Sequence, residues 1–199
     1  MQGMSWPADL SEDRSDTPTG GRQANVFLVG PMGAGKTTIG RHVAAMLGME
    51  FADSDQEIEA RTGANIPLIF EIEGEEGFRR REAAVIADLV LRPNLVLATG
   101  GGVVLNSANR EALRDHGTVV YLRAATEILV ERTRRDRGRP LLQTADPHGR
   151  IEELMRQRDP LYRSTAHLIV DTDRRSPQAV ARDVVTRLKT LKPYENPGS

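Results

Sequence analysis

The chain has 199 residues, of which 27 are lysine or arginine, 28 are aspartate or glutamate and none is cysteine. A chain of this length can bury the core of one domain without disulfides or a structural metal. The lack of cysteine excludes disulfides, zinc–thiolate sites and cysteine nucleophiles, and the formal charge of -1 gives no footprint for nucleic acid or an anionic membrane.

The two ends of the chain lack the apolar anchors of a folded segment. Residues 1–23 are rich in Ser, Asp, Thr, Gly and Pro, which predicts a disordered N-terminal extension, with an ordered, bound tail as the alternative. This stretch lacks the apolar core of a signal peptide, and no run reaches the roughly 20 apolar residues of a membrane helix, so we expect a cytoplasmic protein. Residues 193–199 are predicted to form a C-terminal tail, which leaves 24–192 as a single domain.

Between these ends, short apolar strands alternate with helical patterns. Strands are predicted at 25–30, 51–52, 95–99, 118–122 and 167–171, and helices at 37–47, 56–61, 77–91, 107–116, 125–134, 150–158 and 177–191. Buried strands separated by helices predict an α/β fold, with a parallel sheet covered on both faces. Such sheets bind ligands beyond the carboxyl ends of their strands, where three glycine-rich or acidic segments of this chain fall.

The first of these segments follows the first strand and opens the first helix. It has the spacing G-x-x-x-x-G-K-T, which predicts a loop that binds the phosphates of a nucleoside triphosphate. Lys36 is expected to reach the β- and γ-phosphates, and the Thr37 hydroxyl to ligate Mg²⁺. The expected nucleotide-binding residues here are Gly33, Ala34, Gly35, Lys36, Thr37 and Thr38. A chance glycine-rich turn is the alternative, but the strand–loop–helix context favours a small kinase, and no N-K-x-D motif supports a GTPase.

Asp53-Ser54-Asp55 follows the second predicted strand. On an extended chain its two carboxylates would point the same way, so that one could serve a metal and the other could orient or deprotonate a hydroxyl. The alternative is that Ser54 or Asp55 caps the helix predicted from Gln56.

A charged segment and a glycine run offer further candidates. Arg79 and Glu82, at a predicted helix start, are three residues apart and can pair, which would orient Arg79 toward a ligand carboxylate, or they form a solvated charged face. The glycine run, Gly100, Gly101 and Gly102, directly follows a strand and implies close approach of a ligand or another chain segment. Approach of a ligand is favoured, because a simple turn would need only one glycine.

Two arginine-containing segments lie further along the chain. The run from Arg132 to Arg139 before Pro140 is interpreted as a mobile lid that brings Arg139 to the transferred phosphoryl group, continuing to about residue 149. Nucleic-acid binding and a solvated helix end are the alternatives. Pro160 is expected to stop the preceding helix, which leaves Arg158 near its end. The loop 171–177 either flanks the base of a nucleotide or caps the last helix through Ser176.

Taken together, six motifs occur in a specific order. They are G-P-M-G-A-G-K-T-T, D-S-D, G-F-R-x-x-E, a strand ending in T-G-G-G, R-P-L-L and R-x-P-L-Y, and in this order the chain resembles shikimate kinase over about residues 24–191. The resemblance implies a three-layer αβα P-loop NTPase fold with a five-stranded parallel sheet, a substrate-binding segment at about 53–82 and a lid at about 133–149. It also implies MgATP-dependent phosphorylation of the shikimate 3-hydroxyl in chorismate and aromatic amino-acid biosynthesis, and we expect a monomer.

The resemblance also implies roles for residues at the acceptor. Asp55 resembles the residue that binds the ring hydroxyls and acts as the base. Arg79 and Arg158 resemble a clamp for the carboxylate of shikimate, with Glu82 holding Arg79, and Gly101 resembles a backbone contact.

Around the nucleotide, Asp53 resembles the residue that holds Mg²⁺ through water, with Thr37 as its partner. Arg139 is similar to the lid arginine on the phosphates and Arg175 to a residue near the adenine, while Lys36, with Asp55 and Arg139, completes the expected catalytic set.

Two other functions fit the same scaffold. One is a gluconate-type or other small-metabolite kinase, whose acceptor would not need both arginines on one carboxylate. The other is a nucleotide-binding module that regulates a partner without phosphoryl transfer.

Overall fold

A computed structural model describes residues 24–134 and 146–191 of the chain. The strands are β1 (Asn25–Val29), β2 (Glu50–Asp53), β3 (Leu95–Ala98), β4 (Gly117–Arg123) and β5 (Leu168–Asp171). The helices are α1 (Lys36–Leu47), α2 (Ser54–Thr62), α3 (Ile66–Leu89), α4 (Ser107–His116), α5 (Thr126–Thr133), α6 (Pro147–Thr165) and α7 (Pro177–Thr190), with a short 3₁₀ helix, η1 (Val103–Leu105). No helix within these two ranges is long and apolar enough to cross a membrane.

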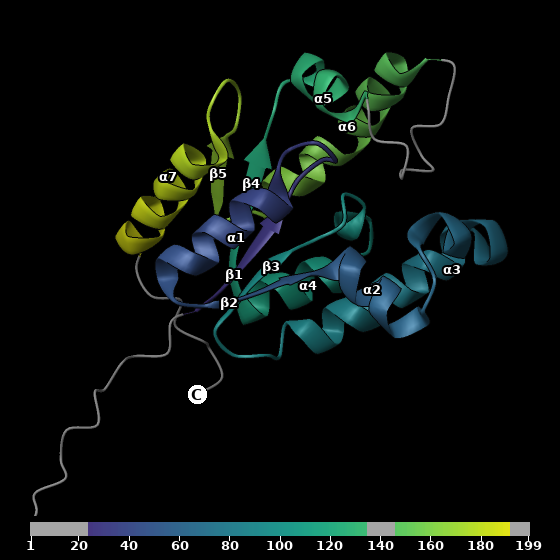
Figure 1. The fold of residues 1–199 in the computed structure, drawn as a ribbon, viewed down its shortest axis with the longest axis horizontal. Coiled ribbons are helices and arrows are strands. Elements are labelled where there is room, and N and C mark those ends of the chain that lie inside the picture. Colours follow the sequence, from purple (N-terminus) through teal and green to yellow (C-terminus); the bar gives the residue numbers. More distant parts are fainter. Residues whose placement is uncertain (1–23, 135–145, 192–199) are drawn as a thin grey trace, which may run out of the picture.

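The five strands form one parallel sheet in the order β2-β3-β1-β4-β5 (Figure 1). The central strand β1 pairs with β3 and β4, so that Phe27 lies opposite both Leu97 and Val119. The predicted α/β fold and its five strands are confirmed. Because all strands run in one direction, the segments that follow β1, β2 and β3 meet at the same edge of the sheet.

Two apolar layers fix the sheet between its helices. Alternate residues of β1 point to opposite faces, as the pleat of a strand requires. Val26 and Leu28 pack in one core with buried residues of α1 and α7, whereas Phe27 and Val29 pack in the other with buried residues of α3 and α4. Helices therefore cover both faces (Figure 1), and the loops at the carboxyl edge are carried on a rigid sheet.

Helix α3 differs from the prediction, which placed its start at residue 77. It begins at Ile66, where the Asn65 side chain accepts a hydrogen bond from Leu68 N and Pro67 occupies the first turn, a position that needs no backbone donor. Gly74 then adopts the non-helical values φ 68 and ψ −177, so a kink divides α3 into two helical parts. Arg79 lies near the start of the second part, close to the helix start predicted at residue 77.

Helix α6 also exceeds the prediction of 150–158. The Asp146 side chain caps it by accepting a hydrogen bond from Gly149 N, so residues 147–149, which the predicted lid included, are helical. The helix also continues through Pro160 to Thr165, although proline there provides no backbone donor. The prediction that Pro160 stops the helix is therefore wrong. The rest of the predicted lid, at 135–145, lies outside the described residues.

Candidate active site

The phosphate-binding loop joins β1 to α1. Gly35 is the N-cap of α1 with φ 92, and the buried ammonium group of Lys36 donates hydrogen bonds to the carbonyls of Gly30 (2.7 Å) and Pro31 (2.8 Å). Gly30 has φ +139, and a Cβ atom there would lie 2.5 Å from the carbonyl oxygen of Leu122. The start of α1 and the Lys36 ammonium therefore lie together, a combination that suits a phosphate.

Asp53 connects this loop to the next segment. Its Oδ2 accepts a hydrogen bond from the Thr37 hydroxyl at 2.7 Å. Its Oδ1 accepts from the backbone N–H groups of Asp55 (3.0 Å) and Gln56 (3.4 Å), which makes Asp53 the N-cap of α2. The alternative prediction that Ser54 or Asp55 caps this helix is wrong. The predicted extended conformation at Asp55 is also wrong, since Asp55 lies in the first turn of α2. The helix begins there because the Asp53 carboxylate accepts hydrogen bonds from the free N–H groups of that turn.

The glycine run after β3 is surrounded by charged side chains. A Cβ atom at Gly100 would lie 2.8 Å from both Asp55 Oδ1 and Glu82 Oε1, and one at Gly102 would overlap the Arg79 guanidinium. The run has glycine because these side chains, from α2 and α3, occupy the space that other residues would need. Close approach of another part of the chain, one of the two predicted alternatives, is therefore present, and the approach of a ligand stays a prediction.

Arg79 is held by carboxylates of its own helix. Its Nη1 donates to Glu82 Oε2 at 2.8 Å, and its Nη2 donates to Glu75 Oε1 at 3.0 Å, so the predicted pairing of Arg79 with Glu82 is present. The Glu82 side chain is only 1% exposed. Burial raises the pKa of Glu82, although the positive charges of Arg79 and Arg158 act against that rise.

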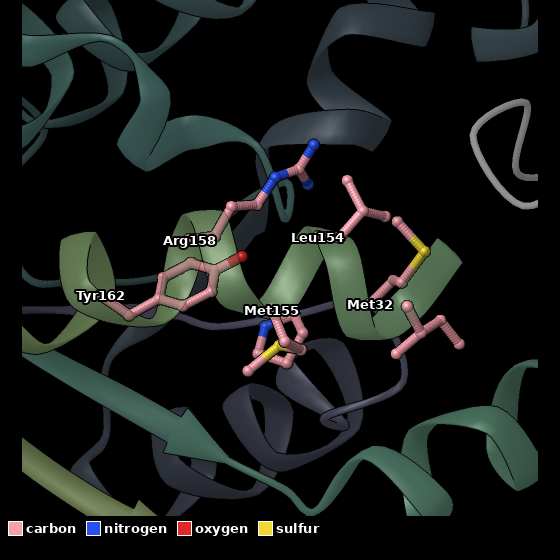
Figure 2. A pocket seen from close by; sticks show the side chains of 7 residues that line it. Met32, Leu154, Met155, Arg158 and Tyr162 are labelled. Carbon is pink, nitrogen blue, oxygen red and sulfur yellow. The ribbon is translucent and has the colours of Figure 1, made fainter. Parts of the chain in front are cut away.

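Arg158 reaches the same glycine run from α6. Its Nη1 donates to the carbonyl oxygen of Gly101 at 3.3 Å, and the hydroxyl of Tyr162, one turn later, donates to the same oxygen. Figure 2 shows both side chains on α6 beside a small pocket that Met32 of the phosphate-binding loop also lines. Burial lowers the pKa of Arg158, and the charge of Arg79 lowers it further.

The two arginines create a cationic site around Gly101 and Gly102. The Arg79 guanidinium lies close enough for its positive charge to lower the pKa of Arg158. The Glu82 carboxylate accepts its hydrogen bond from Arg79. Within the described part of the chain, the Nε atoms of Arg79 and Arg158 are buried without a hydrogen-bond partner, as is Glu82 Oε1. Buried guanidinium donors in this arrangement suit a carboxylate ligand.

Of the remaining predicted nucleotide-binding residues, Arg139 lies outside the described residues, so only Thr38 and Arg175 can be placed. Thr38 is exposed on α1. Arg175 pairs with Asp183 at 2.9 Å, and Ser176 caps α7 by accepting a hydrogen bond from Ala179 N, as one of the two alternatives for this loop predicted.

Three side chains for which the sequence predicted no role in the site contact these segments. The buried Ser54 hydroxyl accepts a hydrogen bond from Gly100 N at 3.0 Å, and Tyr162 bonds to Gly101. Arg132 donates to the carbonyl of Gly33 at 3.2 Å. Ser54 and Tyr162 belong to the motifs D-S-D and R-x-P-L-Y. Their position in these motifs is the feature of the sequence that could have indicated a role in the site.

Shikimate kinases are among the proteins with the most similar sequences. The family model described as shikimate kinase matches residues 32–189. Shikimate kinases of Thiobacillus denitrificans and Nitrosospira multiformis are 58% and 56% identical, over 86% and 82% of this chain and 93% and 84% of theirs. The structure of shikimate kinase from Acinetobacter baumannii in complex with shikimate is similar with a TM-score of 0.84 and 50% identity, over 86% of this chain and 96% of that one.

Proposed function

The chain belongs to the shikimate kinase family, and we propose that it transfers the γ-phosphoryl group of ATP to the 3-hydroxyl of shikimate. The products are shikimate 3-phosphate and ADP, in the biosynthesis of chorismate and the aromatic amino acids. The observation that carries the proposal is the convergence of Arg79, Arg158 and Asp55 on the glycine run. Gly101 also lies against the phosphate-binding loop, since a Cβ atom there would be 3.3 Å from Met32 N.

The acceptor site suits a small anion that carries hydroxyl groups. We assign the shikimate carboxylate to Arg79 and Arg158, because two guanidinium groups can bind a carboxylate through several charge-assisted hydrogen bonds. Glu82 orients Arg79 through the 2.8 Å contact. Gly101 provides a backbone contact to the ring of the substrate.

Asp55 is assigned as the group that orients the 3-hydroxyl and accepts its proton. It lies at the start of α2 with its Oδ1 facing Gly100, and the adjacent Asp53 contacts the phosphate-binding loop. A carboxylate within hydrogen-bond reach of an attacking hydroxyl is a common general base in phosphoryl transfer. The oxygen of the 3-hydroxyl then forms the new bond to phosphorus as the bond to the leaving ADP breaks.

The nucleotide phosphates are assigned to the loop at 30–37 and the start of α1. Lys36, which bonds to the loop carbonyls in the structure, would turn its ammonium group to the β- and γ-phosphates. Arg139 from the lid would neutralise charge on the transferred group, and Arg175 would lie near the adenine. These two assignments depend on the family resemblance, since Arg139 lies outside the described residues and Arg175 pairs with Asp183.

Thr37 and Asp53 fit a magnesium ion that accompanies ATP. The Thr37 hydroxyl and the Asp53 carboxylate lie 2.7 Å apart and are the hard oxygen ligands that Mg²⁺ prefers. Among the described residues, no group of three or more His, Cys, Asp or Glu side chains could hold a metal, which fits an ion that takes its other ligands from phosphates and water. When bound, Mg²⁺ would neutralise charge on the phosphates.

We further propose that the protein acts as a monomer in the cytoplasm and binds neither nucleic acid nor membranes. The formal net charge of only -1 gives no excess of positive charge that would attract nucleic acid or an anionic membrane. Light scattering of the purified protein tests the monomer, since a dimer would double the mass.

The substrate is tested by a coupled ADP-release assay with a panel of acceptors. We expect ADP release to depend on shikimate and to stay at the buffer rate with gluconate. Faster release with gluconate would support the gluconate-type kinase instead. Nucleotide binding without ADP release for any acceptor would support a regulatory module.

A further inference from the structure

The glycine run needs an outside contact to keep its shape. Residues without side chains have the largest backbone freedom and no rotamer packing to restrict them. Yet Gly101 must hold one conformation between α6 and the phosphate-binding loop. The contacts to its carbonyl oxygen therefore restrict the run.

Tyr162 supplies one of two hydrogen bonds to that oxygen. Its hydroxyl and Arg158 Nη1 both donate to Gly101 O, the arginine at 3.3 Å, and the Tyr162 hydroxyl also interacts with Arg158 itself. The two residues are one turn apart on α6, so their side chains share a helix face. Figure 2 shows the Tyr162 hydroxyl and the extended Arg158 side chain on the same side of the helix.

Tyr162 is itself held firmly in place. Its side chain is fully buried, and its ring stacks on that of Tyr121 with 5.0 Å between the ring centroids. The Tyr121 hydroxyl in turn donates to Asp159 Oδ1 at 2.8 Å, which ties β4 to α6. Burial raises the pKa of Tyr162, so its hydroxyl keeps the proton that it donates.

Holding the Gly101 carbonyl has two consequences for the site. The peptide unit is planar and trans, so a fixed carbonyl also fixes the N–H of Gly102, which points the opposite way. The bond from Tyr162 also satisfies an oxygen that would otherwise depend on Arg158 alone. The Arg158 guanidinium can then turn its donors toward an anion without leaving a buried carbonyl unpaired.

We propose that Tyr162 is a positioning residue of the acceptor site: it orders the glycine run and frees Arg158 to bind the anionic acceptor. The identity of that acceptor rests on the function proposed above. Tyr162 itself touches Gly101 and not the reacting atoms.

The test compares Tyr162→Phe with Tyr121→Phe. Each change removes one phenolic hydroxyl from the same stacked pair, but only Tyr162 bonds to Gly101. We expect Tyr162→Phe to raise the KM for shikimate about three- to tenfold, the effect of losing one hydrogen bond, with kcat and the KM for ATP within about twofold. We expect Tyr121→Phe to leave the KM for shikimate within about twofold of the unaltered chain.

Two results would overturn the proposal. One is an unchanged KM for shikimate in Tyr162→Phe, and the other is an equal rise in Tyr121→Phe. If the unaltered chain phosphorylated another acceptor of the panel, the same comparison would be made with that acceptor, so that an error in the substrate stays separate from an error about Tyr162.

If Tyr162→Phe does not fold, the hydrogen bond from Tyr162 to Gly101 can be tested by a measurement on the unaltered chain. Proton NMR with labelled tyrosine reports how fast each hydroxyl proton exchanges with water. A slowly exchanging Tyr162 hydroxyl that becomes no faster when shikimate is added supports the proposal, because the bond to Gly101 then persists while Arg158 binds the acceptor. Exchange as fast as in free tyrosine would overturn it.

Discussion

Replacing Arg158 by methionine should change stability and substrate binding in opposite directions. Arg158 is 5% exposed, and burial and the charge of Arg79 both lower its pKa, so its positive charge is unfavourable in the protein without substrate. Methionine has a similar length and can fill the space of the arginine stem. The carbonyl of Gly101 keeps its hydrogen bond from Tyr162. The change therefore removes a charge without leaving a buried oxygen unpaired.

The expected magnitudes follow from these contacts. Replacing buried charges by apolar groups of similar volume is neutral or stabilises a protein by about 1–4 kcal/mol, so the free energy of unfolding should be unchanged or higher. Removing one partner of a buried ionic contact weakens binding by about 2–5 kcal/mol. That loss raises the dissociation constant for shikimate about 30- to 4000-fold.

Two measurements separate these effects. Urea denaturation followed by circular dichroism gives the free energy of unfolding, and calorimetric titration with shikimate gives the dissociation constant. Arg163→Met is the matched control on the same helix, because Arg163 is exposed and forms a surface ion pair with Asp159 at 2.6 Å. We expect the control to change either quantity by less than about 1 kcal/mol.

The reasoning would be refuted by either of two results for Arg158→Met. Shikimate binding within twofold of the unaltered chain would remove Arg158 from the clamp. A loss of several kcal/mol of stability would show that Arg158 holds the fold together and is not a cation kept for a ligand.

Three further changes test other parts of the site and the fold. Asp55→Asn should bind ATP with unchanged affinity by calorimetry but lower kcat by at least about 100-fold, and unchanged turnover would remove Asp55 from the mechanism. Gly100→Ala places a Cβ atom 2.8 Å from Asp55 Oδ1 and Glu82 Oε1, so it should raise the KM for shikimate and lower the free energy of unfolding by about 1–3 kcal/mol; unaltered kinetics would contradict this crowding. Burial lowers the pKa of His167, whose Nδ1 accepts a hydrogen bond from Val119 N, so the unfolded chain binds the proton more readily. Stability should then fall as the pH drops below the unfolded-state pKa of about 6.5, by at most about 1.4 kcal/mol per pH unit, and the slope should be flatter in His167→Asn, as denaturation from pH 5 to 8 would reveal.

Features encoded by neighbouring residues were predictable. The five strands and the phosphate-binding loop were found because apolar runs and the G-x-x-x-x-G-K-T spacing are local patterns. The pairing of Arg79 with Glu82 followed from helical spacing alone.

Features that depend on contacts between residues far apart in the sequence were not predictable. Pro160 was expected to end its helix, but α6 continues where Tyr121 bonds to Asp159 and Tyr162 bonds to Gly101. Such contacts make up for the backbone hydrogen bond that proline cannot form. Local propensity carries no information about them.

The linear pattern of this chain was enough to identify an α/β kinase and to predict the residues of its acceptor site. It could not say that Asp53 caps α2 while bonding to Thr37, or that Tyr162 and Arg158 share one carbonyl of the glycine run. Motifs are read along the backbone, whereas the contacts of Arg158 and Tyr162 join α6 to a loop 57 or more residues away and exist only once the sheet has folded. The physical reason is that a buried hydrogen bond depends on which groups packing brings together in space, and not on their order in the chain.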